Sequence, residues 1–506
     1  MSRTKNSIRN IIFTIIGSIV VTLVQLINRR FFVNYLTEDY LGLNGLFHNI
    51  ISILSVSEMG IGTAIIFALY KPVAENDKEK IKSLMALYKK LYSGIGLFVL
   101  VAGMLLTPFL HVFIKEMPDI PYIHLYYMMY VIDSGMSYFY TYKRSIIICN
   151  QEDYISSTST MVASVTMRLT QLLILALSHN YFLYLLVQIL FTRLENVIIS
   201  KIADWKYPYL SEKEVQALDK EDVTSIKKNI LAMMTTKVGS VIVSGTDNLI
   251  ISKILGLTVV GLYSNYMLLI NTLNSLIGKV FNAITASVGN LVVNKSTDEV
   301  EEVFNNILFA NYIIYNVAAI GFWCLLQPFV KLWLGSELLL SDAAVWIFVA
   351  VFYVNGMRLT VLTFRNVLGL FWHDRYRAIL EAIVNLALSI PLTFLYGIVG
   401  VKLGSLIALV VTTFWVEGYI LFKNYFNKSF IKYIFKQGIY AGITLLECVA
   451  IDYVCRVIYT EGVMNFILQA IVCVSLCGVL TILFFGRTKE FQYYFKMVGG
   501  IFKRKL

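Results

Sequence analysis

Long apolar segments recur along the whole chain, and they constrain its fold more than any other feature of the sequence. Each segment is about 17–25 residues long, which is the length that a helix needs to cross the hydrocarbon core of a bilayer. Because that core offers no water to hydrogen-bond, the backbone of such a segment must satisfy itself as a helix. The segments do not alternate between apolar and polar residues, as the strands of a transmembrane β-barrel would. The sequence therefore predicts an all-α, polytopic integral membrane protein.

The composition agrees with this prediction. Hydrophobic residues make up 58% and charged residues 15% of the 506 residues, whereas a soluble domain is about 45–50% apolar and about 25% charged. We predict fourteen transmembrane helices, at residues 8–28, 43–70, 89–114, 121–148, 156–178, 180–202, 229–252, 258–291, 304–329, 344–368, 377–397, 399–422, 437–457 and 463–485.

Lysine and arginine are distributed unevenly between the connecting segments. Residues 71–90, 201–228 and 423–436 and the tail 487–505 are rich in these cations, whereas the alternate connections hold few of them. Because positively charged connections stay in the cytoplasm, we expect both termini to be cytoplasmic. The net charge of +11 reflects this bias and an attraction to anionic lipid, so it implies no nucleic-acid partner.

The chain also repeats itself, and the second copy keeps nearly one register with the first across several predicted helices. Pro108 and Pro328 lie in similar segments, Arg144 matches Arg365, and Asp153 matches Asp374. Each copy holds six predicted helices, an even number, so the two copies have the same orientation in the membrane. Parallel repeats of this kind are related by an axis along the membrane normal and hold substrate between them.

The duplication predicts how the chain is divided. We expect an N-terminal six-helix lobe at residues 1–205 and a C-terminal six-helix lobe at 229–425. The polar residues 206–228 predict an amphipathic helix on the cytoplasmic surface, since Ser211 and Glu214 have capping-box spacing. Two extra helices occupy 426–486, and a basic cytoplasmic tail occupies 487–506.

Several classes of function find no support in the sequence. No G-x-x-x-x-G-K-[ST] phosphate loop exists, and no soluble region is large enough for a nucleotide-binding domain. No Ser/His/Asp or paired-carboxylate arrangement stands out, and the connections on the outer side are short. The six cysteines and five histidines show no metal-ligand spacing. We therefore expect a carrier rather than an enzyme, with no metal and no cofactor.

The predicted helices contain charged residues, although a charge at the bilayer centre costs about 2.5–3.5 kcal/mol on insertion scales. One interpretation is structural ion pairing between helices. The other is an anion-binding cavity, with one or two carboxylates that couple transport to a cation. The charges within the predicted helices are Glu58, Asp133, Arg168, Arg193, Glu195, Lys237, Asp247, Lys279, Arg358, Glu417 and Glu447.

Tyrosines mark one face of the fourth predicted helix. Tyr122, Tyr126 and Tyr130 recur with helical periodicity, and Asp133 lies close to the same line. Aromatic rings can stack on sugar faces. Ordinary helix packing or an interfacial belt explains such a stripe more often.

The segment 28–47, with Tyr40-Leu41-Gly42-Leu43-Asn44-Gly45, is similar to the first loop of bacterial polysaccharide flippases, and so is the segment 57–77, which begins Ser-Glu-Met-Gly-Ile-Gly. These flippases form the polysaccharide transporter family of the multidrug/oligosaccharidyl-lipid/polysaccharide (MOP) superfamily. Gly245-Thr246-Asp247-Asn248 and the segment 261–266 resemble the seventh and eighth helices of that family. The resemblance covers both predicted lobes, and the extra helix pair resembles that of the lipid II flippases.

The resemblance implies two lobes that alternate access and move an undecaprenyl-pyrophosphate-linked oligosaccharide from the inner to the outer leaflet. It implies a role in the assembly of capsule or other cell-surface polysaccharide. We expect the substrate cavity to hold Arg168, Lys237, Lys279 and Arg358, with Arg29 at the outer mouth and Tyr126 and Tyr130 on the glycan. We expect Glu58, Asp133 or Asp247 to couple transport to H⁺ or Na⁺.

Two other functions stay open at this point. A multidrug antiporter of the same superfamily would need an acidic or apolar cavity, and five buried cations argue against it. A non-transporting membrane scaffold for glycan assembly would leave those buried charges unexplained. The expected partners are the lipid-linked oligosaccharide and membrane lipids, with a polysaccharide polymerase and glycosyltransferases as candidates. The expected location is the bacterial plasma membrane.

Overall fold

The computed structural model describes the chain from residue 3 to residue 503, with gaps. The described residues are 3–58, 60–150, 152–212, 216–220, 223–224, 226–227, 230, 245–370, 373, 376–458 and 462–503. Every regular element among them is helical, which confirms the all-α prediction. The chain divides into two units, Met1–Ser264 and Asn265–Leu506. The boundaries predicted at residues 205, 228, 425 and 486 are a finer division and stay a prediction.

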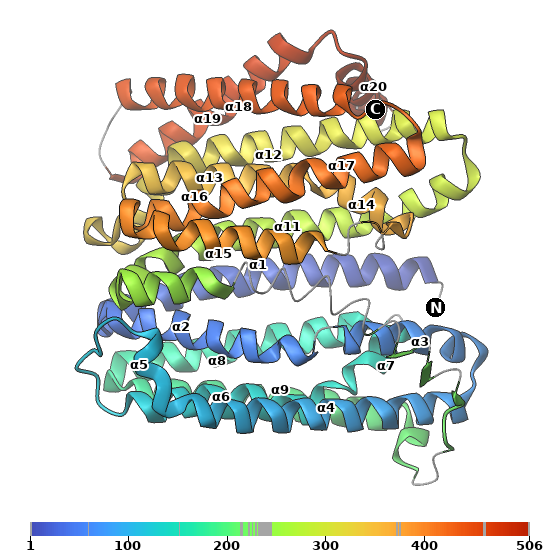
Figure 1. Cartoon of the computed structure of the whole chain (residues 1–506), viewed down its shortest axis with the longest axis vertical. Coiled ribbons are helices and arrows are strands. Elements are labelled where there is room, and N and C mark those ends of the chain that lie inside the picture. The colour runs from blue at the N-terminus through green and yellow to red at the C-terminus, as the bar shows by residue number, and fades with distance from the viewer. Residues whose placement is uncertain are drawn as a thin grey trace. The chain divides into compact units, whose positions relative to one another are not determined.

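The first unit consists of long helices that lie side by side in Figure 1. Helix α1 packs along α8, α8 along α9, α9 along α6, and α6 along α4. Residues 245–254 are helical as well. The helices of this unit are α1 (Arg3–Tyr35), α2 (Glu38–Leu54), α3 (Ile61–Glu75), α4 (Lys78–Leu106), α5 (Leu110–Phe113), α6 (Ile123–Thr141), α7 (Arg144–Cys149), α8 (Asp153–Ser178) and α9 (Tyr181–Lys206).

In the second unit, α12 (Thr297–Leu334) packs against several of the helices that follow it. These include α13, α18 and α19, and α15 packs closely along α16. The boundary between the units falls within α11 (Leu257–Asn294). The other helices are α13 (Asp342–Met357), α14 (Leu359–Val367), α15 (Arg377–Tyr396), α16 (Ile398–Ala408), α17 (Trp415–Leu421), α18 (Ile431–Val457), α19 (Gly462–Phe485) and α20 (Lys489–Lys503), with π-helical turns at Leu409–Phe414 and Phe422–Phe426.

Short polar side chains define where several of these helices begin. The Asp77 carboxylate accepts a hydrogen bond from the Lys80 backbone N–H at 3.0 Å and caps α4. Asn180 caps α9 in the same way through the Leu183 N–H at 3.1 Å. Ser296 and Glu299 form a complete capping box at the start of α12. Each cap satisfies a backbone donor that the first helical turn leaves without a partner.

Helix α1 continues past the predicted end at residue 28 and reaches Tyr35. Arg29, which we expected beyond this helix at an outer mouth, therefore lies within it. The second predicted span, 43–70, is broken into α2, a 3₁₀ turn at Ser55–Glu58, and α3. Gly60 has φ of 95° at this break, a conformation that residues with a Cβ rarely adopt. The break places Glu58 at the end of a short turn rather than in mid-helix.

Ten helices in the described part of the chain are long and apolar enough to cross a membrane. Their faces carry exposed apolar side chains such as Leu177 (75%), Phe394 (71%) and Leu483 (72%). Apolar surface on this scale is rare on soluble monomers and suits contact with lipid. Four predicted spans are not among the ten: the broken 43–70, the spans 121–148 and 258–291, and 229–252, which is described only in part. The number fourteen therefore stays a prediction.

The internal duplication has a structural counterpart in each unit. Gly135 on α6 lies against Leu100 of α4, and Gly356 on α13 lies against Tyr315 of α12. The two glycines occupy corresponding positions of the two copies. At each site a Cβ would overlap the neighbouring helix, so both repeats need glycine where the same two helices approach closely.

The C-terminal tail, predicted as a basic segment, forms helix α20 over most of its length. Its Tyr494 hydroxyl donates to the Asn306 carbonyl oxygen of α12 at 3.1 Å. Its Glu490 pairs with Lys436 of α18 at 2.7 Å. The predicted surface helix at 206–228 lies largely outside the described residues.

Candidate functional site

A polar cavity of about 400 Å³ lies within the first unit. This volume falls in the range of small-molecule sites. The cavity lies among α1, α2, α6, α8 and α9. Its lining residues are Gln25, Asn28, Arg29, Phe32, Asn44, His48, Tyr130, Met167, Arg168, Gln171, Tyr184, Gln188 and Thr192.

Helical spacing brings these side chains to one place. On α9, the lining residues Tyr184, Gln188 and Thr192 recur once per helical turn and so share one face. On α8, Arg168 and Gln171 are related by the same periodicity. On α1, residues 25, 28, 29 and 32 form a stripe of the same kind. Three otherwise apolar helices therefore turn their polar faces toward one another.

Hydrogen bonds hold the walls of this cavity in place. The Asn28 amide donates to the backbone oxygen of Arg168 at 3.0 Å and accepts from the Tyr184 hydroxyl at 3.1 Å. The Gln171 amide donates to the Tyr184 backbone oxygen at 3.2 Å. Asn28 is 3% and Gln171 1% exposed. This buried amide network fixes α1, α8 and α9 relative to one another.

The cavity is cationic. Arg29 and Arg168 both line it, and none of its lining residues is a carboxylate. Arg29 also donates to the Ser264 hydroxyl. No carboxylate of the described residues lies within salt-bridge distance of Arg168, whose backbone oxygen is engaged by Asn28. Of the expected cavity residues, the structure thus brings together Arg29, Arg168 and Tyr130.

Tyr126 lies in a second pocket of the same unit, about 480 Å³ in volume. Tyr40, Tyr122 and Tyr181 line this pocket with it. The Tyr126 and Tyr181 ring centroids are 4.9 Å apart, and the Tyr181 hydroxyl is 3.3 Å from that of Tyr130. The tyrosine stripe of α6 is therefore packed against other aromatic rings, as the packing alternative predicts, while it borders both pockets.

The three expected ion-coupling carboxylates occupy separate places. Glu58 accepts hydrogen bonds from the hydroxyls of Tyr92 at 2.7 Å and Tyr138 at 3.0 Å. Asp133 accepts from the Gln188 amide at 3.1 Å, next to the cationic cavity. Asp247 is 3% exposed and accepts from the Tyr263 hydroxyl at 3.1 Å. Each carboxylate thus accepts hydrogen bonds from neutral donors, and the structure does not gather the three into one site.

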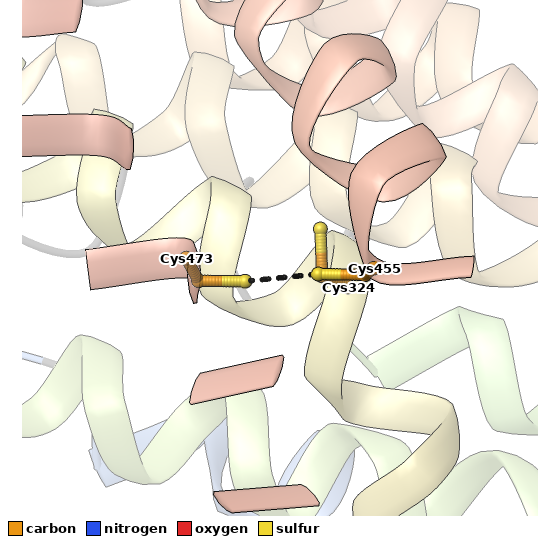
Figure 2. Close-up of side chains that lie close together, drawn as sticks. All are labelled: Cys324, Cys455 and Cys473. Carbon is orange, nitrogen blue, oxygen red and sulfur yellow. Dashed lines mark hydrogen bonds between the residues drawn. The ribbon is translucent and has the colours of Figure 1, made fainter. Parts of the chain in front are cut away.

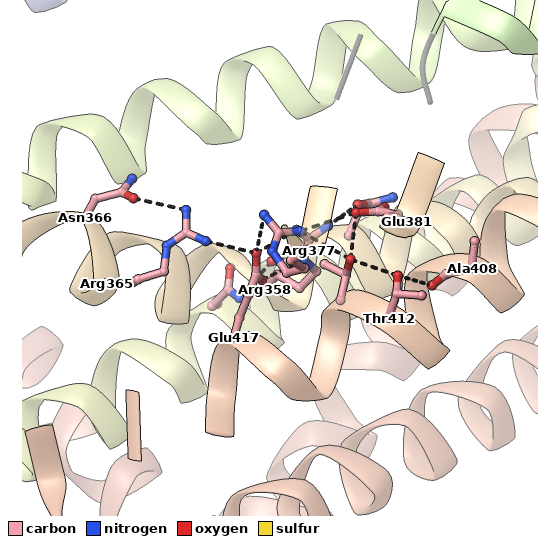
Figure 3. Close-up of polar contacts among 12 residues, drawn as sticks. Arg358, Arg365, Asn366, Arg377, Glu381, Ala408, Thr412 and Glu417 are labelled. Atoms are coloured by element: carbon pink, nitrogen blue, oxygen red, sulfur yellow. Dashed lines mark hydrogen bonds and ion pairs between the residues drawn. The ribbon is translucent and has the colours of Figure 1, made fainter. Parts of the chain in front are cut away.

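Arg358, expected in the substrate cavity, lies instead in a buried charge cluster of the second unit (Figure 3). Its Nε and Nη2 atoms donate to the two oxygens of Glu417, both at 2.9 Å. Arg365 at 3.4 Å and Arg377 at 3.2 Å also pair with Glu417, whose side chain is 1% exposed. Glu381 pairs with Arg377 at 3.3 Å. This geometry supports the ion-pairing interpretation for Arg358.

Two other cations of the predicted helices, Arg193 and Lys279, are not among the residues that line this cavity. Arg193 donates from Nη2 to the backbone oxygens of Ile132 at 2.7 Å and Asp133 at 3.2 Å. Its guanidinium therefore links α9 to α6. Lys279 lies on α11 in the second unit, where it is partly buried. Lys237 lies outside the described residues.

Three cysteines that are far apart in the sequence meet in the second unit (Figure 2). The sulfur atoms of Cys324, Cys455 and Cys473 all lie within 4.8 Å of one another, and those of Cys455 and Cys473 are 3.9 Å apart. The three residues come from α12, α18 and α19 and belong to one apolar cluster. Thiols with this geometry could ligate a soft metal ion. All three are buried and pack as small core residues.

Sequence reasoning missed most of the cavity wall, although a signal was present. Tyr184, Gln188 and Thr192 interrupt an apolar helix once per turn, and Asn28 and Gln171 are isolated amides in apolar segments. Uncharged polar residues at helical spacing within a predicted membrane span would have indicated this wall. The sequence did not indicate which residues pair with Glu417, because only the fold brings α13, α14, α15 and α17 together.

The comparisons with known proteins agree with this fold. The family model described as "polysaccharide biosynthesis protein" matches residues 7–288. No curated protein sequence matches the chain. Among solved structures, the lipid II flippase MurJ in an inward closed conformation is similar with a TM-score of 0.63 and 14% identity, over 94% of this chain and 99% of the other.

Two multidrug transporters are similar as well. An inward-facing multidrug-resistance MATE transporter of the MOP superfamily has a TM-score of 0.61 and 13% identity, over 81% of this chain and 98% of the other. A MATE transporter of Vibrio cholerae has a TM-score of 0.62 and 14% identity, over 85% and 98%. At these identities the likeness shows the fold, which is that of MOP superfamily transporters.

Proposed function

The chain belongs to the polysaccharide biosynthesis protein family, and from that premise we propose that it is a flippase for a lipid-linked oligosaccharide. The substrate class would be an undecaprenyl-pyrophosphate-linked repeat unit that moves from the inner to the outer leaflet of a bacterial plasma membrane. The family and the fold are those of multi-pass membrane transporters rather than enzymes. The observation that carries the proposal is the cationic cavity of the first unit.

The pyrophosphate is the part of such a substrate that is hardest to move. An unpaired anion in hydrocarbon is very costly, because it loses its hydration. Arg29 and Arg168 offer fixed positive charge in place of water, and guanidinium groups can grip phosphate oxygens with two parallel hydrogen bonds. Gln25, Asn44 and Gln188, which line the cavity and are only partly buried, supply polar groups for the first sugar. The polyprenyl tail could stay in lipid throughout.

The charge of the cavity also separates this function from its alternatives. A multidrug antiporter that binds cationic drugs would need an acidic or apolar site, whereas this cavity is lined by two arginines and no carboxylate. A non-transporting scaffold would gain nothing from placing two arginines in a cavity. Coupling to H⁺ or Na⁺ through Glu58, Asp133 or Asp247 remains part of the proposal, as do cytoplasmic termini and contacts with a polymerase and glycosyltransferases.

The test is the flipping of a fluorescent undecaprenyl-pyrophosphate-linked saccharide in proteoliposomes. We expect Arg168→Ala or Arg29→Ala to slow flipping by roughly 10- to 100-fold, which corresponds to the loss of one charge-assisted hydrogen bond of about 1.5–3 kcal/mol. Arg168→Lys should restore part of the rate, since an ammonium keeps the charge without the bidentate geometry.

Arg193→Ala is the matched control, because it removes a partly buried arginine of the same unit that does not line the cavity. Per folded molecule it should flip at nearly the wild-type rate. Unchanged flipping in both cavity variants, measured on folded protein, would rule out this cavity as the substrate site.

A further inference from the structure

Glu447 is a second deeply buried glutamate of the second unit, and its surroundings differ from those of Glu417. It lies near the middle of α18 and is 1% exposed. Where Glu417 has three arginines, no lysine, arginine or histidine of the described residues lies within salt-bridge distance of Glu447. The Asn316 amide of α12 donates a hydrogen bond to its Oε2 at 2.6 Å.

The second oxygen of this carboxyl, Oε1, is buried and has no hydrogen-bond partner among the described residues. Further oxygens of neighbouring side chains are buried close to this carboxyl, and the Thr444 hydroxyl interacts with those of Tyr312 and Tyr353. These buried oxygens are Asn316 Oδ1, the hydroxyls of Tyr312 on α12 and Tyr353 on α13, and the hydroxyl of Thr444 one turn before Glu447 on α18. Other titratable groups close to these side chains, among the described residues, are the thiols of Cys448 on α18 and Cys477 on α19. The Tyr440 ring stacks on that of Tyr312, with ring centroids 4.1 Å apart.

An unpaired, ionised carboxylate in this position has a high free energy. Burial disfavours the ionised form strongly, and one amide hydrogen bond does not replace the lost hydration. All of the groups around Glu447 are neutral at physiological pH. One monovalent cation would therefore neutralise the site completely, and the buried oxygens around Oε1 are the ligands or acceptors that such a cation would need.

We propose that Glu447, with Asn316, Tyr312, Tyr353 and Thr444, forms a buried binding site for one monovalent cation, H⁺ or Na⁺. In the protonated form the carboxyl keeps no charge and its O–H can donate to a neighbouring oxygen. With Na⁺, the carboxylate and the surrounding oxygens replace water around the ion. The site ties α18 to α12 and α13, and it is separate from Glu58, Asp133 and Asp247.

The inference goes beyond the proposed function, because it concerns cation binding and needs no glycan. Its test uses wild-type protein and dicyclohexylcarbodiimide, an apolar reagent that attacks protonated carboxyls and leaves a stable N-acylurea. Peptide mass spectrometry after labelling at pH 6 should show at least roughly tenfold more adduct at Glu447 than at Glu417. The adduct at Glu447 should decrease as the pH rises to 9.

Sodium distinguishes the two occupants. If Na⁺ binds, 100 mM NaCl in place of choline chloride should reduce the adduct at constant pH; if only H⁺ binds, the adduct should follow pH alone. Both results support the site. Equal labelling of Glu447 and Glu417, or a Glu447 adduct that ignores both pH and Na⁺, would overturn it.

A second measurement does not depend on access of the reagent. Glutamine resembles the protonated acid, so Glu447→Gln should melt close to wild type at pH 6. Without Na⁺, the wild type should lose stability relative to this variant as the pH rises, since the native state binds a proton that the unfolded state releases. A difference in melting temperature that is constant from pH 6 to 9, with and without Na⁺, would contradict the proposal.

Discussion

The helix pair α8/α9 of the first unit and the pair α15/α16 of the second are counterparts in the internal duplication, yet they are built differently. In α8/α9, Arg168 lines a polar cavity of about 400 Å³. Its counterpart in the second copy is Ser389, which is fully buried and donates to the Val401 backbone oxygen at 3.1 Å. Gly404 of α16 lies so close to Ser389 that a Cβ there would be 2.7 Å from its backbone nitrogen.

The two pairs show how one architecture can serve two purposes. Glycines let α15 and α16 approach until no space remains, and this stabilises the second unit through contact alone. On α8 and α9, polar side chains such as Arg168, Gln171 and Gln188 line a cavity instead. The duplicated fold thus keeps its helices, while the residues at their interface decide which copy encloses a polar cavity.

The ion pairs at corresponding positions of the two units also differ, in the number of arginines around the glutamate. Arg144 pairs with Glu195 at 2.6 Å in the first unit, and Arg365 pairs with Glu417 in the second. The two arginines occupy corresponding positions of the duplication, and the two glutamates correspond to within a single position. Among the described residues, two further arginines, Arg358 and Arg377, pair with the glutamate of the second copy, and no further arginine pairs with Glu195 of the first.

Removal of the buried glutamate should have the largest effect on stability. Glu417→Gln leaves three buried arginines without their shared anion, and breaking a buried pair of this kind costs about 3–5 kcal/mol. Glu195→Gln, in the more exposed pair, should cost less, about 1–3 kcal/mol. The measurement is thermal or denaturant unfolding in detergent. Equal losses in the two variants would show that the extra arginines of the second unit add nothing.

The close packing of α15 on α16 leads us to predict a smaller loss of stability when it is disturbed. Gly404→Ala places a methyl group against the Ser389 backbone, and overpacking of this kind costs about 1–3 kcal/mol. Gly442→Ala is the control, because a Cβ at this position of α18 meets no atom within 4 Å. It should be neutral or stabilise the helix by up to about 1 kcal/mol. If both variants unfold at the wild-type midpoint, α15 and α16 are less tightly packed than the structure indicates.

Much of the fold could be predicted from the sequence, because membrane helices satisfy their own backbone hydrogen bonds and can be recognised as long apolar segments. The register of the duplication followed from matches such as Arg144 with Arg365. The break at Gly60 and the extension of α1 to Tyr35 did not follow, since hydropathy does not report backbone conformation or helix ends in polar surroundings.

The candidate site was predicted less completely, for a physical reason. A single sequence shows that Arg168 and Arg358 are both charges within apolar helices, but their partners come from other helices. Arg358 meets Glu417, far away in the sequence, whereas Arg168 meets a cavity wall of neutral amides. Tertiary packing alone separates a structural pair from a charge that is available to a substrate.

The most direct test of this account is the affinity of purified protein for undecaprenyl pyrophosphate without a glycan, compared among wild type, Arg168→Ala and Ser389→Ala. These two substitutions fall at corresponding positions of α8 and α15. We predict that Arg168→Ala weakens binding by roughly 10- to 100-fold, while Ser389→Ala binds within about twofold of wild type, since its side chain serves packing. Wild-type affinity in Arg168→Ala, or an equal loss in both variants, would contradict the assignment of the pyrophosphate site to the cavity of the first unit.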